Sequence, residues 1–185
     1  MLNVLTHVAR PIFRKTRAAL YAYVAPEGPD SHLSSHSLDR VPLGAEVEIS
    51  SRPAQDLYQV WRTIPGGHKW WHYFRVYENI IGPFRSGPIR LLEVGVYKGG
   101  SLAMWRKYLH PASVIVGLDI DGACAQHDRP TEKVHVRIGD QSDEAFLRGV
   151  VEEFGPFDVI IDDASHRMLD QQQTCAILFP LLRPG

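Results

Sequence analysis

From residue 89 onward, short apolar runs alternate with segments of helical periodicity. Runs rich in Val, Ile and Leu predict four buried strands, over 89–95, 113–120, 133–140 and 157–164. Apolar residues that recur every three or four positions predict helices over 99–111, 142–155 and 167–182. Because strands that alternate with helices form parallel βαβ units, the pattern predicts an α/β fold, a Rossmann-like doubly wound parallel sheet. We expect Ser142 to be the N-cap of the helix that follows it.

The first part of the chain has a different pattern. Residues 2–24 have an apolar face and an arginine-bearing face, which predicts a helix. Residues 25–56 are rich in Pro, Gly, Ser and His, as is typical of a linker or long loop. We expect a short strand over 57–64 and an aromatic-rich helix over 66–84, ended by a Gly-Pro pair.

These patterns divide the chain into an N-terminal helix and linker, residues 1–56, and a partial α/β domain, residues 57–185. On the aromatic-rich helix, one stripe is expected to face the core; it consists of Trp70, Phe74, Tyr77 and Ile81. A second set of side chains could line a pocket: Lys69, His72, Tyr73 and Tyr77.

Composition describes an ordinary globular protein. Of the 185 residues, 44% are hydrophobic and 22% are charged, and the formal net charge is −1. Such a charge gives no field that attracts nucleic acid, and no apolar run is long enough to span a membrane. Cys124 and Cys175 suggest neither a disulfide framework nor a metal-ligand pair. Because no secretory signal is visible, we expect a cytoplasmic protein that binds neither nucleic acid nor membrane.

Acidic residues mark the carboxyl ends of the predicted strands. Glu93 belongs to the first strand, Asp119 ends the second, Asp140 follows the third, and Asp162 and Asp163 follow the fourth. In doubly wound sheets, ligands bind at this edge. Two adjacent acids point to opposite sides, so one of the last pair would face a cofactor and the other a substrate.

A glycine loop between the first strand and its helix narrows the choice of ligand. Asp119 suits the two hydroxyls of a ribose, which fits NAD as well as S-adenosylmethionine. Dinucleotide folds need Gly-x-Gly-x-x-Gly, but here Tyr97 stands at the middle glycine position, two residues after Gly95. Glu93 suits a cationic sulfonium, although it could instead pair with a lysine such as Lys98. The loop therefore favours S-adenosylmethionine.

We assign Asp140 to the exocyclic amine of adenine, with the Gln141 backbone as a second partner, although an acid at this position also serves as a turn residue. The full set of expected cofactor contacts is Glu93, Gly95, Tyr97, Ser101, Asp119, Asp140, Gln141 and Asp162.

Five motifs in order resemble those of the class I S-adenosylmethionine-dependent methyltransferases, over residues 66–185: "EVGVYKGG", "GLDI", "IGD", "FDVIIDDASH" and "LLRPG". A narrower resemblance joins "HKWWHYFRVYENI", "LLEVGVYKGGSLAMW" and "IDDASH" to the sugar O-methyltransferases of the macrocin and mycinamicin type. This resemblance implies O-methylation of a sugar hydroxyl on a glycosylated small molecule, in antibiotic biosynthesis. It also implies that Asp163 binds Mg²⁺ and that His166 is the general base.

The same resemblance places two further metal-binding acids after a fifth strand, past Gly185. We therefore expect a sheet truncated after the fourth strand and its helix, with Asp163 as a lone Mg²⁺ ligand. The fourth strand would have an exposed apolar edge, which favours homo-oligomers or aggregation. Three alternatives stay open: a non-catalytic remnant that binds the cofactor or a partner, an NAD-dependent oxidoreductase, and an interaction module that uses the basic N-terminal helix.

Overall fold

The computed structural model describes residues 20–21, 55–65, 69 and 72–184 of the chain. Predictions that fall on the other residues lie outside this part. They include the linker over 25–56, the N-terminal helix apart from residues 20–21, and the side chains of Trp70 and His72.

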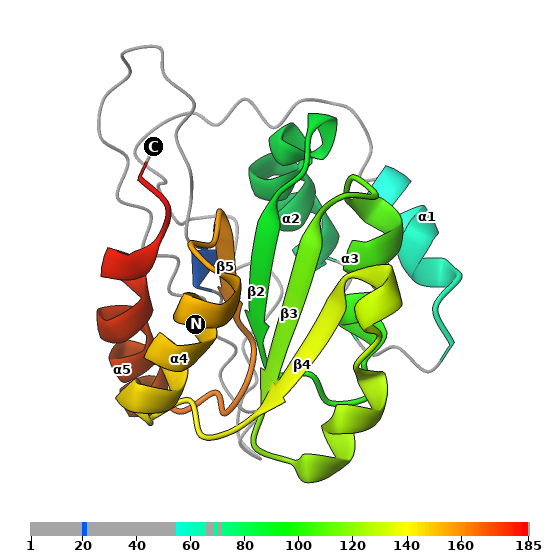
Figure 1. The fold of residues 1–185 in the computed structure, drawn as a ribbon. Coiled ribbons are helices and arrows are strands. Elements are labelled where there is room, and N and C mark those ends of the chain that lie inside the picture. The colour runs from blue at the N-terminus through cyan, green and yellow to red at the C-terminus, as the bar shows by residue number, and fades with distance from the viewer. Residues whose placement is uncertain (1–19, 22–54, 66–68, 70–71, 185) are drawn as a thin grey trace, which may run out of the picture.

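The centre of the fold is a parallel sheet in the order β1-β5-β2-β3-β4 (Figure 1). Its strands are β1 Leu20–Tyr21, β2 Arg90–Val94, β3 Val114–Asp119, β4 Val134–Ile138 and β5 Val159–Asp162. The last four are the strands that the apolar runs predict. The Rossmann-like α/β fold is therefore confirmed.

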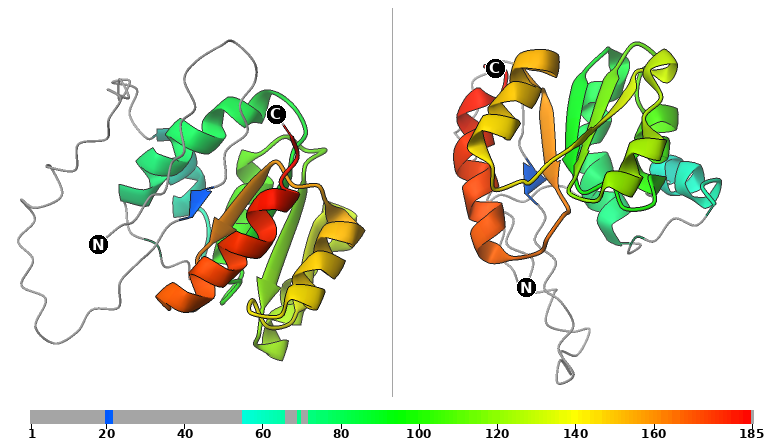
Figure 2. Two further views of the ribbon diagram at one scale, coloured as in Figure 1. Left: turned by 90° about the vertical axis from the view of Figure 1, so that its left-hand side faces the viewer. Right: turned by 60° about the horizontal axis from the view of Figure 1, so that its bottom comes forward.

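Helices cover both faces of the sheet. One face carries α1 Gln55–Arg62, α2 His72–Ile81 and α3 Gly100–Tyr108, and the other carries α4 Glu144–Phe154 and α5 Met168–Leu178 (Figure 1). Figure 2 shows the same two layers from two further directions. Short 3-10 turns complete the connections: η2 Gly82–Ser86, η3 Gly122–His127, η4 Pro130–Glu132 and η5 Phe179–Leu181.

Alternate residues of β2, β3 and β5 build two separate cores. Leu91 of β2 packs with the α1–α3 layer, whereas its neighbour Leu92 packs with α4 and α5. Ile115 and Val116 of β3 divide in the same way. Since both faces of these strands are apolar and covered, the strands read as continuous apolar runs in the sequence.

Most of segment 57–64 belongs to helix α1, which ends at Arg62, and this corrects the predicted strand. Leu57, Val60, Trp61 and Ile64 follow a spacing of three and four residues and pack against the core. Leu57 is fully buried, and its amide donates to Glu78 Oε1 of α2 at 2.6 Å. The period of the apolar positions is therefore that of a helix rather than a strand.

Residues 20–21 form strand β1, so the helix predicted over 2–24 is wrong at these positions. Leu20 pairs with Ile161 and Tyr21 with Asp162, both in β5. The edge of β5 that we expected to be exposed is therefore covered by β1 at these two positions. This pairing joins residues about 140 positions apart, which a local pattern does not reveal.

The cap of α4 is also one residue later than expected. Asp143 Oδ1 accepts hydrogen bonds from the amides of Ala145 and Phe146, at 2.9 and 3.1 Å. Ser142 instead directs its hydroxyl to Asp140 Oδ1 at 2.8 Å. The Ser142 hydroxyl is engaged by Asp140, and Asp143 is the residue directly before the first helical position, so Asp143 takes the cap.

The two cores predict a sharp contrast between two leucines on helices. Leu102 of α3 is fully buried, so Leu102→Ala should lower the free energy of unfolding by about 2–5 kcal/mol. Leu169 of α5 is 68% exposed, so Leu169→Ala should change it by no more than about 0.5 kcal/mol. Urea unfolding of both variants measures this difference, and equal losses would contradict the described packing.

Candidate functional site

The glycine loop after β2 lies at the carboxyl edge and touches the loop after β5. Gly95 adopts φ +102°, and a Cβ at this position would collide with the backbone carbonyl of Asp163. The Gly95 amide donates to Leu118 O at 2.7 Å, and the Asp163 amide donates to Val94 O at 2.8 Å. Glycine is needed here because the loops after β2 and β5 approach each other closely, and this need is independent of any ligand contact.

Asp119 fixes the shape of this loop. Its Oδ2 accepts hydrogen bonds from the amides of Val96 and Tyr97, at 2.8 and 2.9 Å, and its Oδ1 accepts from Asp121 N at 3.0 Å. Partial burial alone would raise the pKa of Asp119, but these amides stabilise the carboxylate and hold its pKa below the ordinary value. Tyr97, with φ +50°, is 69% exposed beside it. Asp119 therefore anchors the loop, and its expected ribose contact stays a prediction.

Glu93 lies beneath the loop, fully buried. Its Oε2 accepts a hydrogen bond from Trp105 Nε1 at 3.2 Å, and its Oε1 lies 3.6 Å from Lys69 Nζ. Burial raises the pKa of Glu93 to about 7, although the Lys69 ammonium acts in the opposite direction. Glu93 thus pairs with a lysine, as the alternative interpretation held, but the partner is Lys69 rather than Lys98.

Lys69 connects three elements of the edge. Its ammonium donates to Ser101 Oγ of α3 and to Asp163 Oδ2 after β5, both at 2.9 Å. Burial alone would lower the pKa of Lys69, but Tyr77, Glu93 and Asp163 together raise it above its ordinary value. From the sequence, Lys69 is predicted only as a possible pocket residue. No local pattern shows its contacts with Glu93 and Asp163, which lie 24 and 94 positions further along the chain.

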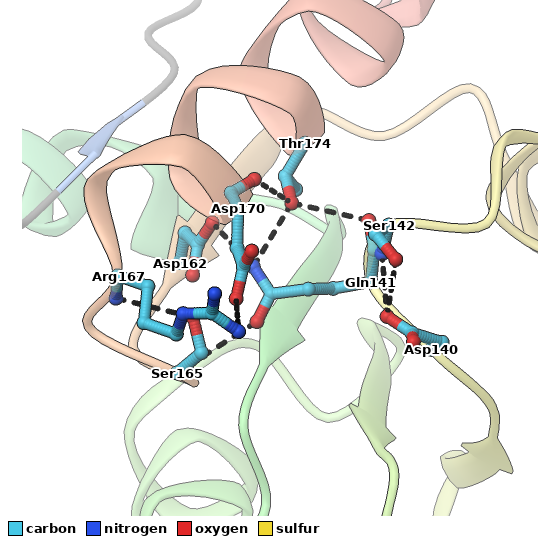
Figure 3. A network of polar contacts seen from close by, with 8 residues as sticks. All are labelled: Asp140, Gln141, Ser142, Asp162, Ser165, Arg167, Asp170 and Thr174. Atoms are coloured by element: carbon cyan, nitrogen blue, oxygen red, sulfur yellow. Dashed lines mark hydrogen bonds and ion pairs between the residues drawn. The ribbon is translucent and has the colours of Figure 1, made fainter.

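Gln141 and Asp162 belong to a buried polar network that joins the loops after β4 and β5 to α5 (Figure 3). Gln141 Nε2 donates to Thr174 Oγ1 at 3.0 Å and to Asp162 Oδ2 at 3.4 Å, and Gln141 Oε1 accepts from Ser165 N at 3.2 Å. Burial raises the pKa of Asp162 to about 6. The network fixes the start of the loop that carries His166.

Asp140 lies exposed at the turn before α4. Its Oδ1 accepts from both the amide and the hydroxyl of Ser142, at 2.8 Å each, and these bonds lower its pKa. This is the turn role that the sequence left open, and the expected contact with adenine stays a prediction.

His166 and Asp163 share the loop between β5 and α5. His166 adopts φ +57°, and within the described residues its buried Nδ1 has no hydrogen-bond partner. The Asp163 side chain is 26% exposed. Across residues 20–21, 55–65, 69 and 72–184, no three His, Cys, Asp or Glu side chains gather as a metal site would need. The metal and base roles therefore stay predictions.

The chain is similar in sequence to known sugar O-methyltransferases. No family model matches the chain. An 8-demethyl-8-(2-methoxy-alpha-L-rhamnosyl)-tetracenomycin-C 3'-O-methyltransferase of Streptomyces olivaceus is 42% identical over 127 residues, which are 63% of this chain and 32% of that protein. A mycinamicin VI 2''-O-methyltransferase of Micromonospora griseorubida is 37% identical over 124 residues, 62% of this chain and 30% of that protein.

The chain is homologous to sugar O-methyltransferases. Among solved structures, MycE methyltransferase from the mycinamycin biosynthetic pathway, in complex with Mg, SAH and mycinamycin VI, superposes with a TM-score of 0.60 at 34% identity. The match covers 71% of this chain and 35% of MycE. The class I methyltransferase fold is therefore confirmed, and the chain spans about a third of the length of these relatives. No helix in the described ranges is long and apolar enough to cross a membrane.

Asp162 generates a prediction about pH. Its pKa is about 6 in the folded protein, against about 4 in an unfolded chain, so the folded state binds the proton more tightly. Asp162 therefore makes the protein less stable as pH rises from about 4 to about 6, by up to roughly 3 kcal/mol. Asp162→Asn should remove this part of the slope in urea unfolding measured across that range.

The matched control is Asp140→Asn, which changes an exposed acid of the neighbouring loop and should leave the slope in place. If Asp162→Asn keeps the wild-type dependence of stability on pH, Asp162 is not a buried carboxyl with a raised pKa.

Proposed function

We propose that the protein containing this chain transfers a methyl group from S-adenosylmethionine to a sugar hydroxyl of a glycosylated natural product. The observation that carries the proposal is the 42% identity to an enzyme named for 3'-O-methylation of a rhamnosyl tetracenomycin. The match to MycE, whose complex holds SAH and a mycinamycin, supports the same cofactor and substrate class.

In the proposed reaction, the sugar oxygen attacks the methyl carbon of the sulfonium. The C–O bond forms as the S–C bond breaks, the sulfur keeps the bonding electron pair, and the hydroxyl proton passes to a base. We assign the base to His166, which lies in the loop between β5 and α5 at the carboxyl edge. A neutral imidazole is a suitable acceptor near neutral pH.

We propose that the cofactor lies along the carboxyl edge, at the residues that the sequence assigned. Burial separates these residues into two groups. Glu93, Gln141 and Asp162 are buried and bonded to other side chains, so we propose that they position the loops. The residues with partly or largely exposed surface are proposed to contact the cofactor: Gly95, Tyr97, Ser101, Asp119 and Asp140.

Mg²⁺ is present in the MycE complex, and Asp163 is the residue we assign to it here. The described residues do not by themselves form a metal site, because Asp163 Oδ2 is bound by the Lys69 ammonium and no cluster of three suitable ligands accompanies it. A single carboxylate holds Mg²⁺ weakly. We therefore assign no step of the reaction to the metal. A cytoplasmic location and assembly into homo-oligomers stay predictions.

Cofactor binding gives the first test. The chain should bind SAH in calorimetry, and Asp119→Ala should weaken binding by about 1–3 kcal/mol, the usual effect of losing a charge-assisted hydrogen bond and the loop anchor. Asp121→Ala is the control, since this nearby acid bonds to the turn at Ala123 instead of the glycine loop. Equal weakening in both variants, or an Asp119→Ala variant that binds normally, would reject the role of Asp119.

Turnover gives the second test, with radiolabelled S-adenosylmethionine and a rhamnosylated tetracenomycin or mycinamicin acceptor. His166→Gln should lower turnover by roughly 100- to 10,000-fold, the usual contribution of a general base, while SAH affinity stays within a few-fold of wild type. His110→Gln, which changes a histidine at the opposite end of the sheet, should keep full turnover. Parallel losses of turnover and affinity in His166→Gln would exclude the base role.

Wild-type protein that binds SAH without turnover would support a non-catalytic remnant instead.

A further inference from the structure

Lys69 is a buried lysine held between Glu93 of β2 and Asp163 in the loop after β5. Its side chain is 4% exposed, and its ammonium lies 2.9 Å from Asp163 Oδ2, 2.9 Å from Ser101 Oγ and 3.6 Å from Glu93 Oε1. The same ammonium lies 5.4 Å from the centre of the Tyr77 ring. Two of the three ammonium donors therefore form hydrogen bonds, to Ser101 and Asp163, whereas Glu93 Oε1 is near enough only for an ion pair.

The members of this cluster differ in their access to solvent. The Glu93 and Lys69 side chains are 0% and 4% exposed, whereas Asp163 is 26% exposed. A cation arriving from solvent would therefore reach the cluster through Asp163. It would find one oxygen of that carboxylate already bound to an ammonium.

A divalent cation and an ammonium on one carboxylate repel each other strongly, because neither is separated from the other by bulk water. Lys69 has a long, flexible stem and can move away, whereas Asp163 is held by its backbone amide, which donates to Val94 O at 2.8 Å. When a divalent cation competes for Asp163, we therefore expect the Lys69 ammonium to move and Asp163 to stay in place.

We propose that Lys69 is an internal counterion of Asp163, and that a divalent cation binds Asp163 only by displacing the Lys69 ammonium. This inference rests on the proposed function only in taking Asp163 as the carboxylate that meets the cation. Displacement would also break the contact between Lys69 and Ser101, at the start of α3. Cation binding at Asp163 is therefore coupled to the position of Lys69 and to its contact with α3.

The first measurement is a titration with Mn²⁺, followed by the paramagnetic resonance signal of the free ion, on wild-type protein and on Lys69→Met. The variant keeps an apolar stem of similar length but carries no charge. It should bind Mn²⁺ at least about tenfold more tightly, since a unit charge this close to the carboxylate is a strong competitor. Lys107→Met, which removes an exposed lysine of α3, is the control and should bind as wild type does. Asp163→Asn added to Lys69→Met should abolish the gain.

Equal or weaker Mn²⁺ binding in Lys69→Met would overturn the inference, as would the absence of Mn²⁺ binding in both proteins. Lys69→Met leaves the fully buried Glu93 without its cation, so a fold failure of the variant has to be separated from the effect on Mn²⁺ binding. A measurement on the wild-type protein covers this case. Acetylation of lysines, followed by mass spectrometry, should find Lys69 protected without Mn²⁺ and at least about fivefold more reactive when Mn²⁺ is bound, while exposed Lys107 does not change. Continued protection of Lys69 at saturating Mn²⁺ would overturn the inference.

SAH calorimetry on the same samples separates this inference from the proposed function. SAH binding together with Mn²⁺ affinities that do not respond to Lys69→Met would overturn the counterion role and leave the proposed function standing. Tighter Mn²⁺ binding in Lys69→Met with no SAH binding would support the counterion role and count against the proposed function.

Discussion

Acids gathered at one end of a parallel sheet repel one another unless each finds a donor or a cation, and this constraint organises the whole carboxyl edge. Asp119 is satisfied by the backbone amides of the glycine loop. Glu93 and Asp163 share the Lys69 ammonium. Asp162 is bonded to Gln141, and burial keeps its pKa high. Each partner comes from a different loop or helix, so satisfying the acids also fixes the loops relative to one another.

For a methyltransferase of the proposed kind, this arrangement has two consequences. The glycine loop is shaped before any cofactor arrives, because Asp119 and the close contact at Gly95 hold it. Preorganisation of this kind lowers the entropic cost of binding. Beside the glycine loop, the Lys69 ammonium binds Asp163, the acid that the resemblance assigns to a metal. Ligand binding there is an exchange of partners, so its affinity depends on how readily Lys69 leaves.

Much of this fold follows from the sequence because strands buried on both faces leave continuous apolar runs, and β2, β3 and β5 are of this kind. The glycine loop and the edge acids could be placed for the same reason. Segment 57–64 was misassigned because so short a stretch does not by itself separate helical from strand periodicity, and only the packing of Leu57, Val60 and Trp61 on the core decides it. Strand β1 and the contacts of Lys69 could not be foreseen, since Leu20 pairs with Ile161 and Lys69 meets Asp163, partners 141 and 94 positions away along the chain. Asp143 rather than Ser142 is the cap because the helix starts at Glu144 and the Ser142 hydroxyl is engaged by Asp140.

The central claim is that the carboxylate of Asp119 holds the glycine loop in its binding conformation. Amide hydrogen exchange at Val96 and Tyr97 measures this most directly, because the Tyr97 side chain is largely exposed and cannot shield its own amide. We predict that both amides of the protein without added cofactor exchange at least about a hundredfold more slowly than in an unstructured peptide, as hydrogen-bonded amides do. Exchange of both at the rate of an unstructured peptide would contradict the account.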